Sequence, residues 1–372
     1  MARLRVGVIG AGAIASCVHI PIMKRRSDLF EVVALADLNI EAVNVLADRF
    51  GIEERYDNAF TMIEKSKLDM VAVVNSGKHA DFVVAALNAG IDVFCEKPLA
   101  YTHAEMAAIE SAMKTSGRKL MIGYMKTFDP AVYAAAAEIK GARARTVDVV
   151  VLHPSGESQL ATTDLSVDIP KAPASLIPVF QKSALEVQTE ALGAKAAAEI
   201  GNLYTDIIMG SVIHEFSVLR SLDVHIEHVD FVDRWPKTPK TESIIIAGRT
   251  SDGVRVTIRW FYLDQYPMYQ EEVRWVNENE GHHIIFSSPY ILRVPTKYIK
   301  TTREGLDHKE ITFNSYVASF ENELEAFHRY VETGQQQTDP IAAGYEDMIL
   351  SQKIATAILD GENIEKGGEL TR

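Results

Sequence analysis

The stretch that most constrains the fold is Arg5–Ser16, RVGVIGAGAIAS, in which a short apolar run ends in a cluster of small residues. Such a run is typical of a strand that is buried on both faces of a parallel sheet. Gly10, Gly12 and Ala15 follow the spacing G-x-G-x-x-G/A. This spacing permits a tight turn, a close approach to the backbone and close packing of the next helix on its strand. The stretch therefore predicts the opening of a βαβ unit.

A second apolar run, EVVALAD, ends in Asp37, where the second strand of such a unit should end. A carboxylate there can accept hydrogen bonds from both ribose hydroxyls of adenosine and would repel a 2′-phosphate. The free N–H groups of the first helix would face the pyrophosphate. We therefore expect an NAD site, which a group of N-terminal residues would form: Gly10, Gly12, Ala13, Ile14 and Asp37. The alternative is a plain strand-to-helix turn followed by a strand-end acid.

Strand and helix patterns alternate up to about residue 140, which indicates a doubly wound α/β domain with a parallel sheet. The expected strands are Arg3–Ile9, Glu31–Ala36, Met70–Val74, Asp92–Cys95 and Leu120–Gly123. The expected helices are Ala13–Arg26, Ile40–Phe50, His79–Asn88 and His103–Ser116.

The pattern changes after about residue 142. A strand is expected over Ala144–His153. Residues 154–202 should form a long loop that ends in a helix near Ala191–Ile200, and a loop of this length in a compact domain indicates that the segment is functional or partly helical. A helix over Leu203–Leu222 should precede an open, mostly antiparallel sheet. Its strands are expected at His225–Val232, Ser243–Arg249, Gly253–Tyr262, Glu271–Asn277, His282–Ser287 and Tyr290–Pro295, with closing helices over 315–332 and 344–359. We expect a Rossmann domain over residues 1–126 and an α+β substrate and oligomerisation domain over 127–372.

Composition excludes several classes of protein. The net charge of −13 argues against a nucleic-acid partner, which usually needs a basic face. No apolar run is long enough to suggest a membrane span. Two cysteines are too few for a disulfide framework and favour a reduced, cytoplasmic protein. No metal site is expected, because the adjacent His282 and His283 would point to opposite faces of a strand.

Residues 96–98 read EKP, directly after the strand DVFC. Together with IGYMKTFDP, IHEFSVLR and YVASFENELEAF further on, this block closely resembles the Gfo/Idh/MocA oxidoreductase family. The resemblance runs from Arg3 to about Ile358 and weakens between residues 154 and 202. It implies NAD(P)-linked oxidation or reduction of a sugar, glycoside or cyclitol hydroxyl, a cis bond before Pro98, and a homo-oligomer (dimer or tetramer) formed through the C-terminal sheet.

The resemblance assigns catalytic roles to Lys97 and His214. Oxidising an alcohol requires a base for the hydroxyl proton, and a histidine, whose reference pKa is near 6.5, can supply one. An ammonium group beside the reacting oxygen would stabilise the developing alkoxide. Without the family pattern, Lys97 would read as an exposed strand-end lysine and His214 as a core histidine.

Position predicts further contacts. Asn75, Ser76, His79, Glu96 and Lys97 are expected to contact the cofactor, although His79 could equally pack on the turn at its helix start. Three residues are candidates for the substrate site: Lys126, Ser211 and Tyr262. For Lys126 the alternative is a salt bridge, and for Tyr262 it is a place on an interface sheet.

One departure from the family bears on the reaction. Many sugar and inositol dehydrogenases of the family carry Asp four residues before the histidine and another three after it, where this chain has Gly210 and Ser217. Asp206 lies eight residues upstream, about 12 Å along an α-helix, too far to replace them. This departure counts against ordinary inositol dehydrogenase activity.

Three functions remain open: an NAD-dependent sugar or glycoside dehydrogenase, an NAD-dependent glycoside-cleaving enzyme, and a non-catalytic NAD- or sugar-binding regulator. We expect residues 154–202 to fold over the nicotinamide end of the site and to supply polar groups there. The alternative is that this segment forms an oligomer interface.

Overall fold

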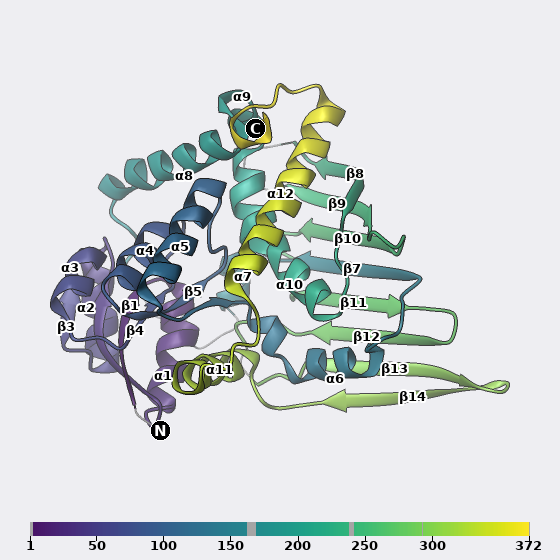
Figure 1. The fold of residues 1–372 in the computed structure, drawn as a ribbon, viewed down its shortest axis with the longest axis horizontal. Helices are drawn as coiled ribbons and strands as arrows, with labels where there is room; N and C mark the ends of the chain where they lie inside the picture. Colours follow the sequence, from purple (N-terminus) through teal and green to yellow (C-terminus); the bar gives the residue numbers. More distant parts are fainter. Residues whose placement is uncertain (1–2, 162–168, 238–241, 292, 372) are drawn as a thin grey trace.

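Two sheets lie side by side in the computed structural model, which describes residues 3–161, 169–237, 242–291 and 293–371 (Figure 1). The N-terminal sheet has six parallel strands in the order β3-β2-β1-β4-β5-β6. Its strands are β1 (Leu4–Ile9), β2 (Phe30–Ala36), β3 (Glu54–Tyr56), β4 (Met70–Val73), β5 (Asp92–Glu96) and β6 (Leu120–Gly123). The predicted doubly wound domain is confirmed.

The order of these strands reverses at β1, between β2 and β4, which is the switch point where open α/β sheets bind ligands. The helices of this half are α1 (Ile20–Arg25) with a π-helical turn before it (η1, Ala15–His19), α2 (Ile40–Phe50), α3 (Ala59–Lys65), α4 (Ala80–Asn88) and α5 (His103–Ser116). Only β3 and α3 were not predicted, since both are short. The carboxyl ends of the strands therefore hold the turns that follow β1, β2, β4 and β5.

The C-terminal sheet has eight strands in the order β14-β13-β12-β11-β7-β10-β9-β8, and all pairs are antiparallel except β7 with β10. The strands are β7 (Thr146–His153), β8 (His228–Trp235), β9 (Ser243–Arg249), β10 (Arg255–Tyr262), β11 (Gln270–Val276), β12 (Glu280–Phe286), β13 (Lys297–Glu304) and β14 (Asp307–Asn314). The largely antiparallel sheet is therefore confirmed.

The strand expected at Tyr290–Pro295 is wrong, because the described residues there form a turn and coil. A proline cannot donate to a sheet ladder, so Pro295 opposes a strand interior. The chain instead pairs β13 with β14 in a hairpin. All eight residues of β14 are exposed. The strand therefore lacks the alternation of apolar and polar residues from which a strand is predicted.

The segment before Ala191 is partly helical, which was one of the two expectations for it. Residues 154–202 contain α7 (Gly156–Ala161), a short 3-10 turn (η3, Ala174–Leu176), α8 (Ile177–Leu192) and α9 (Ala194–Asn202), while residues 162–168 lie outside the described part. Helix α8 buries Val187, Ala191 and Leu192 near its end but leaves Val179, Phe180 and Leu185 exposed. This uneven burial explains why its sequence lacked a clear helical stripe.

The remaining helices join the two halves. They are η2 (Met125–Phe128), α6 (Pro130–Ile139), η4 (Leu203–Val212), α10 (Ile213–Ser221), α11 (Ser319–Thr333), α12 (Pro340–Glu362) and η5 (Gly368–Thr371). Helix α11 packs Phe320, Leu324 and Phe327 into the core of the N-terminal sheet. Figure 1 shows α12 running between the two sheets. No helix among the described residues is long and apolar enough to cross a membrane.

Candidate active site

The turn after β1 leaves room for a bound phosphate group. Gly10 has φ +112°, and a Cβ there would lie 2.6 Å from the backbone N of Asn75. A Cβ on Gly12 would meet no atom within 4 Å, so the space beside this glycine is open. A dinucleotide pyrophosphate requires this kind of close approach to the second glycine.

Asp37 lies directly after β2 and points to the same turn. Its Oδ2 accepts a hydrogen bond from Ala11 N at 2.8 Å, and its Oδ1 accepts one from Asn39 N at 2.8 Å. The two backbone bonds fix the carboxylate at the switch point, where a ribose diol would lie. The predicted cofactor residues of β1 and β2 therefore converge at one edge and fit NAD.

The turn after β4 supplies a further polar group. Asn75 Nδ2 donates to the carbonyls of Ser76 and Lys78, while its Oδ1 is buried without a partner among the described residues. This oxygen is available to a bound hydroxyl or amide. His79, by contrast, has both ring nitrogens 2.7 Å from backbone carbonyls, of Asn75 and Pro98. Its ring therefore joins two loops, while the residue also lines the cleft that contains Lys97.

Lys97 lies in a cleft of about 930 Å³ between the carboxyl edge of the parallel sheet and η4. The peptide bond between Lys97 and Pro98 is cis, as the resemblance implied. Lys97 Nζ donates to the carbonyl of Gly210 at 2.5 Å. Burial lowers the pKa of the Lys97 ammonium, although the nearby Glu96 acts in the opposite direction.

Glu96 also lines this cleft, and its carboxylate is bound by the buried His19. His19 Nε2 lies 2.7 Å from Glu96 Oε1. Burial alone would raise the pKa of Glu96, but the hydrogen bond and charge of His19 lower it overall. Glu96 therefore fixes the loop that presents Lys97.

His214 faces the same cleft from the start of α10. Burial lowers its pKa well below the usual value, and Lys97, Lys126 and His153 act in the same direction. The ring is therefore neutral near pH 7 and can accept a proton. Its Nδ1 is buried and has no partner among the described residues. The carboxylates that Gly210 and Ser217 replace are thus missing in space as well as in sequence.

Asp206 lies in the wall of this cleft together with Thr205, Gly210 and His214. Leu203–Val212 is a π-helix, whose i→i+5 hydrogen bonds make each turn wider than in an α-helix. Asp206 Oδ1 accepts a hydrogen bond from Thr205 Oγ1 at 2.9 Å. Partial desolvation raises the pKa of the Asp206 carboxyl.

Lys126 is an ion-pair residue rather than a cleft residue. Its Nζ lies 3.2 Å from Glu215 Oε1 and also binds Glu271, and the side chain is 3% exposed. Tyr269 donates to the same Glu271 carboxylate. Burial and the neighbouring Glu271 raise the pKa of Glu215 to about 8. Of the two alternatives for Lys126, the structure therefore supports the salt bridge.

The other two substrate candidates lie beside this cluster. Ser211 Oγ accepts a hydrogen bond from Trp260 Nε1 at 2.9 Å, and Tyr262 stacks on His153 with ring centroids 6.4 Å apart. Neither lines the cleft itself. His153 at the end of β7 is half-buried, and burial lowers its pKa to about 4.

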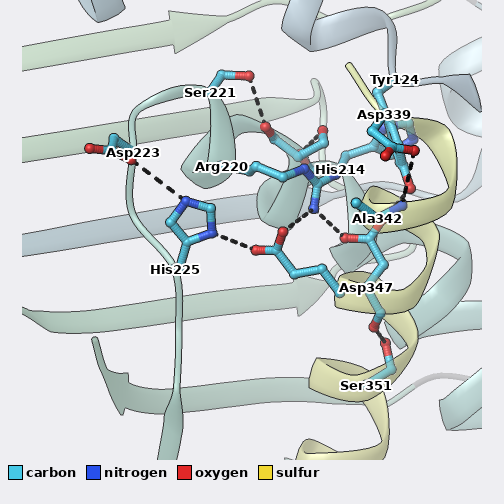
Figure 2. A network of polar contacts seen from close by, with 12 residues as sticks. Tyr124, His214, Arg220, Ser221, Asp223, His225, Asp339, Ala342, Asp347 and Ser351 are labelled. Atoms are coloured by element: carbon cyan, nitrogen blue, oxygen red, sulfur yellow. Dashed lines mark hydrogen bonds and ion pairs between the residues drawn. The ribbon is translucent and has the colours of Figure 1, made fainter. Parts of the chain in front are cut away.

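The helix that carries His214 is anchored at its other end (Figure 2). Arg220 Nη1 lies 2.8 Å from Asp347 on α12, and Tyr124, which follows β6, also binds Asp347. Glu346 bridges Arg220 and His225. This network fixes α10 against both halves of the molecule and so fixes the position of His214.

Several cleft residues escaped the sequence prediction. Six residues that are distant from one another in the sequence also line the cleft: Tyr101, Met125, Thr205, Asp206, Tyr290 and Phe320. The signal that could have found Asp206 is its place on the predicted helix with His214. No group of three metal-ligating side chains occurs among the residues that the structure describes.

Comparison with known proteins agrees with this geometry. Residues 4–124 match the model of the oxidoreductase family with an NAD-binding Rossmann fold (GFO_IDH_MocA). Inositol 2-dehydrogenase of Salmonella paratyphi B is 36% identical over 129 residues, 34% of this chain and 38% of that protein. The counterpart from Acidothermus cellulolyticus is 34% identical over 172 residues, 44% of this chain and 50% of that protein. The matches thus span at most half the length of these two relatives.

Solved structures match over nearly the whole chain, but at low identity. Myo-inositol 2-dehydrogenase from Lactobacillus plantarum covers 97% of this chain and 98% of its own, with a TM-score of 0.69 and 18% identity. A 3-ketoreductase from Actinomadura kijaniata covers 96% of this chain and 98% of its own, with a TM-score of 0.71 and 16% identity. These likenesses establish the two-sheet fold. Over residues 4–124 this chain is therefore similar to the Gfo/Idh/MocA oxidoreductases, whose model describes an NAD-binding Rossmann fold.

Proposed function

We propose that this protein is an NAD-dependent oxidoreductase that transfers a hydride between the nicotinamide and a secondary hydroxyl of a sugar, glycoside or cyclitol. The observation that carries the proposal is the meeting of Lys97 and a neutral His214 in the cleft next to the open cofactor edge. The inositol dehydrogenase relatives support the class of reaction. NAD, when bound, supplies the hydride acceptor.

In this mechanism Gly10, Gly12 and Asp37 hold the dinucleotide, and Asn75 Oδ1 offers an acceptor at its nicotinamide half. The Lys97 ammonium polarises the substrate oxygen and stabilises negative charge that develops on it. His214 takes the hydroxyl proton as the C–H bond breaks. The direct role of Lys97 follows from its place in the cleft and its single protein acceptor, the Gly210 carbonyl.

The test follows NADH formation at 340 nm over a panel of cyclitols, free sugars and neutral glycosides. We expect turnover with at least one class and a loss of at least 100-fold in kcat for Lys97→Ala. Lys114→Ala, on the exposed side of α5, is the matched control and should keep full activity. NAD⁺ binding without turnover across the panel would instead favour a non-catalytic regulator.

A second candidate function, NAD-dependent glycoside cleavage, is favoured by His153. Oxidation of a ring hydroxyl to a ketone acidifies the adjacent C–H, and a base must then remove that proton as the aglycone leaves. His153 is neutral near pH 7 and has an unpartnered Nδ1 within the described residues. Water adds to the product and the NADH formed at first reduces the ketone, so NAD⁺ would act catalytically. Product mass measured beside NADH yield distinguishes the two functions.

A further inference from the structure

A second cavity of about 1090 Å³ adjoins the catalytic cleft, and we call it the distal cavity. It is formed by α8, α9, the start of η4, β8 and the end of α12, and its polar lining includes Gln188, Glu199, Asn202, Asp206, Glu242 and Glu362. Asp206 also lines the catalytic cleft. The two spaces therefore share one lining residue, whose carboxylate lies between them.

The size of the combined space exceeds what one sugar ring needs. The distal cavity is slightly larger than the catalytic cleft, so each space could hold a group of about the same size. A free cyclitol or monosaccharide would leave the distal cavity without a role in binding.

The charges of the distal cavity do not suit an anion. Its two described cations are already paired, since Arg234 binds Glu242 at 2.8 Å and Glu362 at 2.7 Å, and Lys237 binds Glu362 at 3.0 Å. A phosphate would therefore find carboxylates and no free cation among the described lining residues. This arrangement disfavours sugars that carry a nucleoside diphosphate.

The same lining suits hydroxyl groups. Among the described residues, neither Asp206 nor Glu199 has a cationic partner, and Asp206 accepts only the Thr205 hydroxyl. Free carboxylate oxygens accept hydrogen bonds from sugar hydroxyls, and such charge-assisted bonds are the stronger kind. Gln188 holds this wall in place by donating to Asn202 Oδ1 and Thr205 Oγ1 at 3.2 and 3.1 Å.

We propose that the substrate is a neutral glycoside. Its oxidised ring lies in the catalytic cleft beside Lys97 and His214, its second, hydroxyl-bearing part lies in the distal cavity, and Asp206 binds hydroxyls at the junction. This inference rests on the proposed function and narrows its substrate. It also assigns a role in substrate binding to the variable segment 154–202, because α8 and α9 form part of the wall of the distal cavity.

The experiment fills the distal cavity and leaves the catalytic cleft untouched. Ala198 lines the distal cavity from α9 and is exposed, so Ala198→Trp should block it without disturbing the core. Lys195→Trp, an exposed position on the same helix outside the lining, is the matched control. Initial rates with NAD⁺ are measured for methyl glucosides, neutral disaccharides, aryl glucosides and UDP-glucose.

We expect wild type to oxidise a disaccharide or aryl glucoside with a kcat/KM at least tenfold above that of the methyl glucoside. Ala198→Trp should remove most of this advantage and leave the methyl glucoside within twofold, while Lys195→Trp changes neither. Equal loss for both substrate sizes, no loss, or a preference for UDP-glucose would overturn the inference while leaving the proposed function standing. Absence of oxidation with every carbohydrate, with NAD⁺ still bound, would instead reject the proposed function.

Discussion

At the scale of single residues, the site depends on which polar atoms the protein leaves without partners. Asn75 Oδ1 and His214 Nδ1 are buried and unpartnered within the described residues, whereas both nitrogens of His79 face backbone carbonyls. Buried polar groups normally find partners, so the unpartnered ones mark where a ligand or water belongs.

Asp37 determines the choice of cofactor. We expect NAD⁺ to bind better than NADP⁺, because the carboxylate would repel a 2′-phosphate. Asp37→Ala should weaken NAD⁺ binding about 10- to 100-fold, since one charged hydrogen-bond partner of the ribose is lost. Fluorescence titration with both cofactors measures this, with the exposed Asp57→Ala as control. Preference for NADP⁺ in wild type would show that Asp37 does not contact the ribose.

Glu215 predicts a dependence of stability on pH. Its pKa in the folded protein is about 8, above the ordinary value of 4.5, chiefly because of burial. Between these values the folded state binds more protons than the unfolded state, so stability falls as the pH rises. The contribution of Glu215 is fully present below about pH 4.5 and is lost as the pH passes through about 8.

Thermal unfolding measured between pH 5 and pH 8.5 tests whether stability falls as the pH rises. Wild type should lose stability across the range, and Glu215→Gln should decline less steeply because the amide does not titrate. Glu199→Gln, exposed on α9, serves as the comparison and should follow the wild-type slope. Parallel curves for Glu215→Gln and wild type would contradict the assignment of the proton to Glu215.

At the scale of elements, helices and strands were predicted correctly where their buried residues form a regular apolar pattern in the sequence. The predictions failed where an element is largely exposed. The parallel strands β1, β4 and β5 are continuous apolar runs, and the sequence was sufficient to locate them. The exposed strand β14 and the half-exposed helix α8 carry no such period. The helix expected over Leu203–Leu222 begins as a π-helix over Leu203–Val212, and the sequence pattern does not distinguish this from an α-helix.

Helix α10 depends on its anchor at Arg220. Arg220→Ala would leave Asp347, which is 1% exposed, as an uncompensated buried carboxylate. Breaking a buried pair in this way costs about 3–5 kcal/mol. We expect a loss of this size in denaturant unfolding, with a fall in kcat because His214 lies on the same helix. Arg143→Ala, which breaks an exposed pair with Asp252, should cost less than about 1 kcal/mol. Equal losses in both variants would mean that Arg220 is not an anchor.

At the scale of the whole molecule, the two halves share one site. The cleft takes Lys97 from the first half and Asp206 and His214 from the second. The proposed boundary at residues 126 and 127 therefore crosses the active site. Near the middle of the large sheet, β7 leaves Val150 and Leu152 partly exposed beside a shallow depression. Charged and polar side chains surround these two residues in the depression: Asp148, Arg259, Gln270, Glu272 and Arg274.

We propose that this sheet face joins copies of the chain into a dimer or tetramer. Light scattering after size exclusion should give a multiple of 41.2 kDa for wild type. The double variant Val150→Arg, Leu152→Arg should give monomers, while Leu306→Arg, in the exposed β13–β14 turn, should not. Dissociation by Phe180→Arg on α8 instead would locate the interface in the 154–202 segment.

The packing of α11 bears on the order in which the chain can fold during synthesis. Phe320, Leu324 and Phe327 belong to the same core as Val6 and Phe94 on the parallel sheet. A ribosome that has released only the first 126 residues has therefore not yet supplied part of the interior that covers β1 and β5. Domains usually fold in order from the N-terminus as they emerge. Here the NAD-binding half is complete only after residues 320–327 have also emerged, so its folding cannot finish before most of the second half has been made.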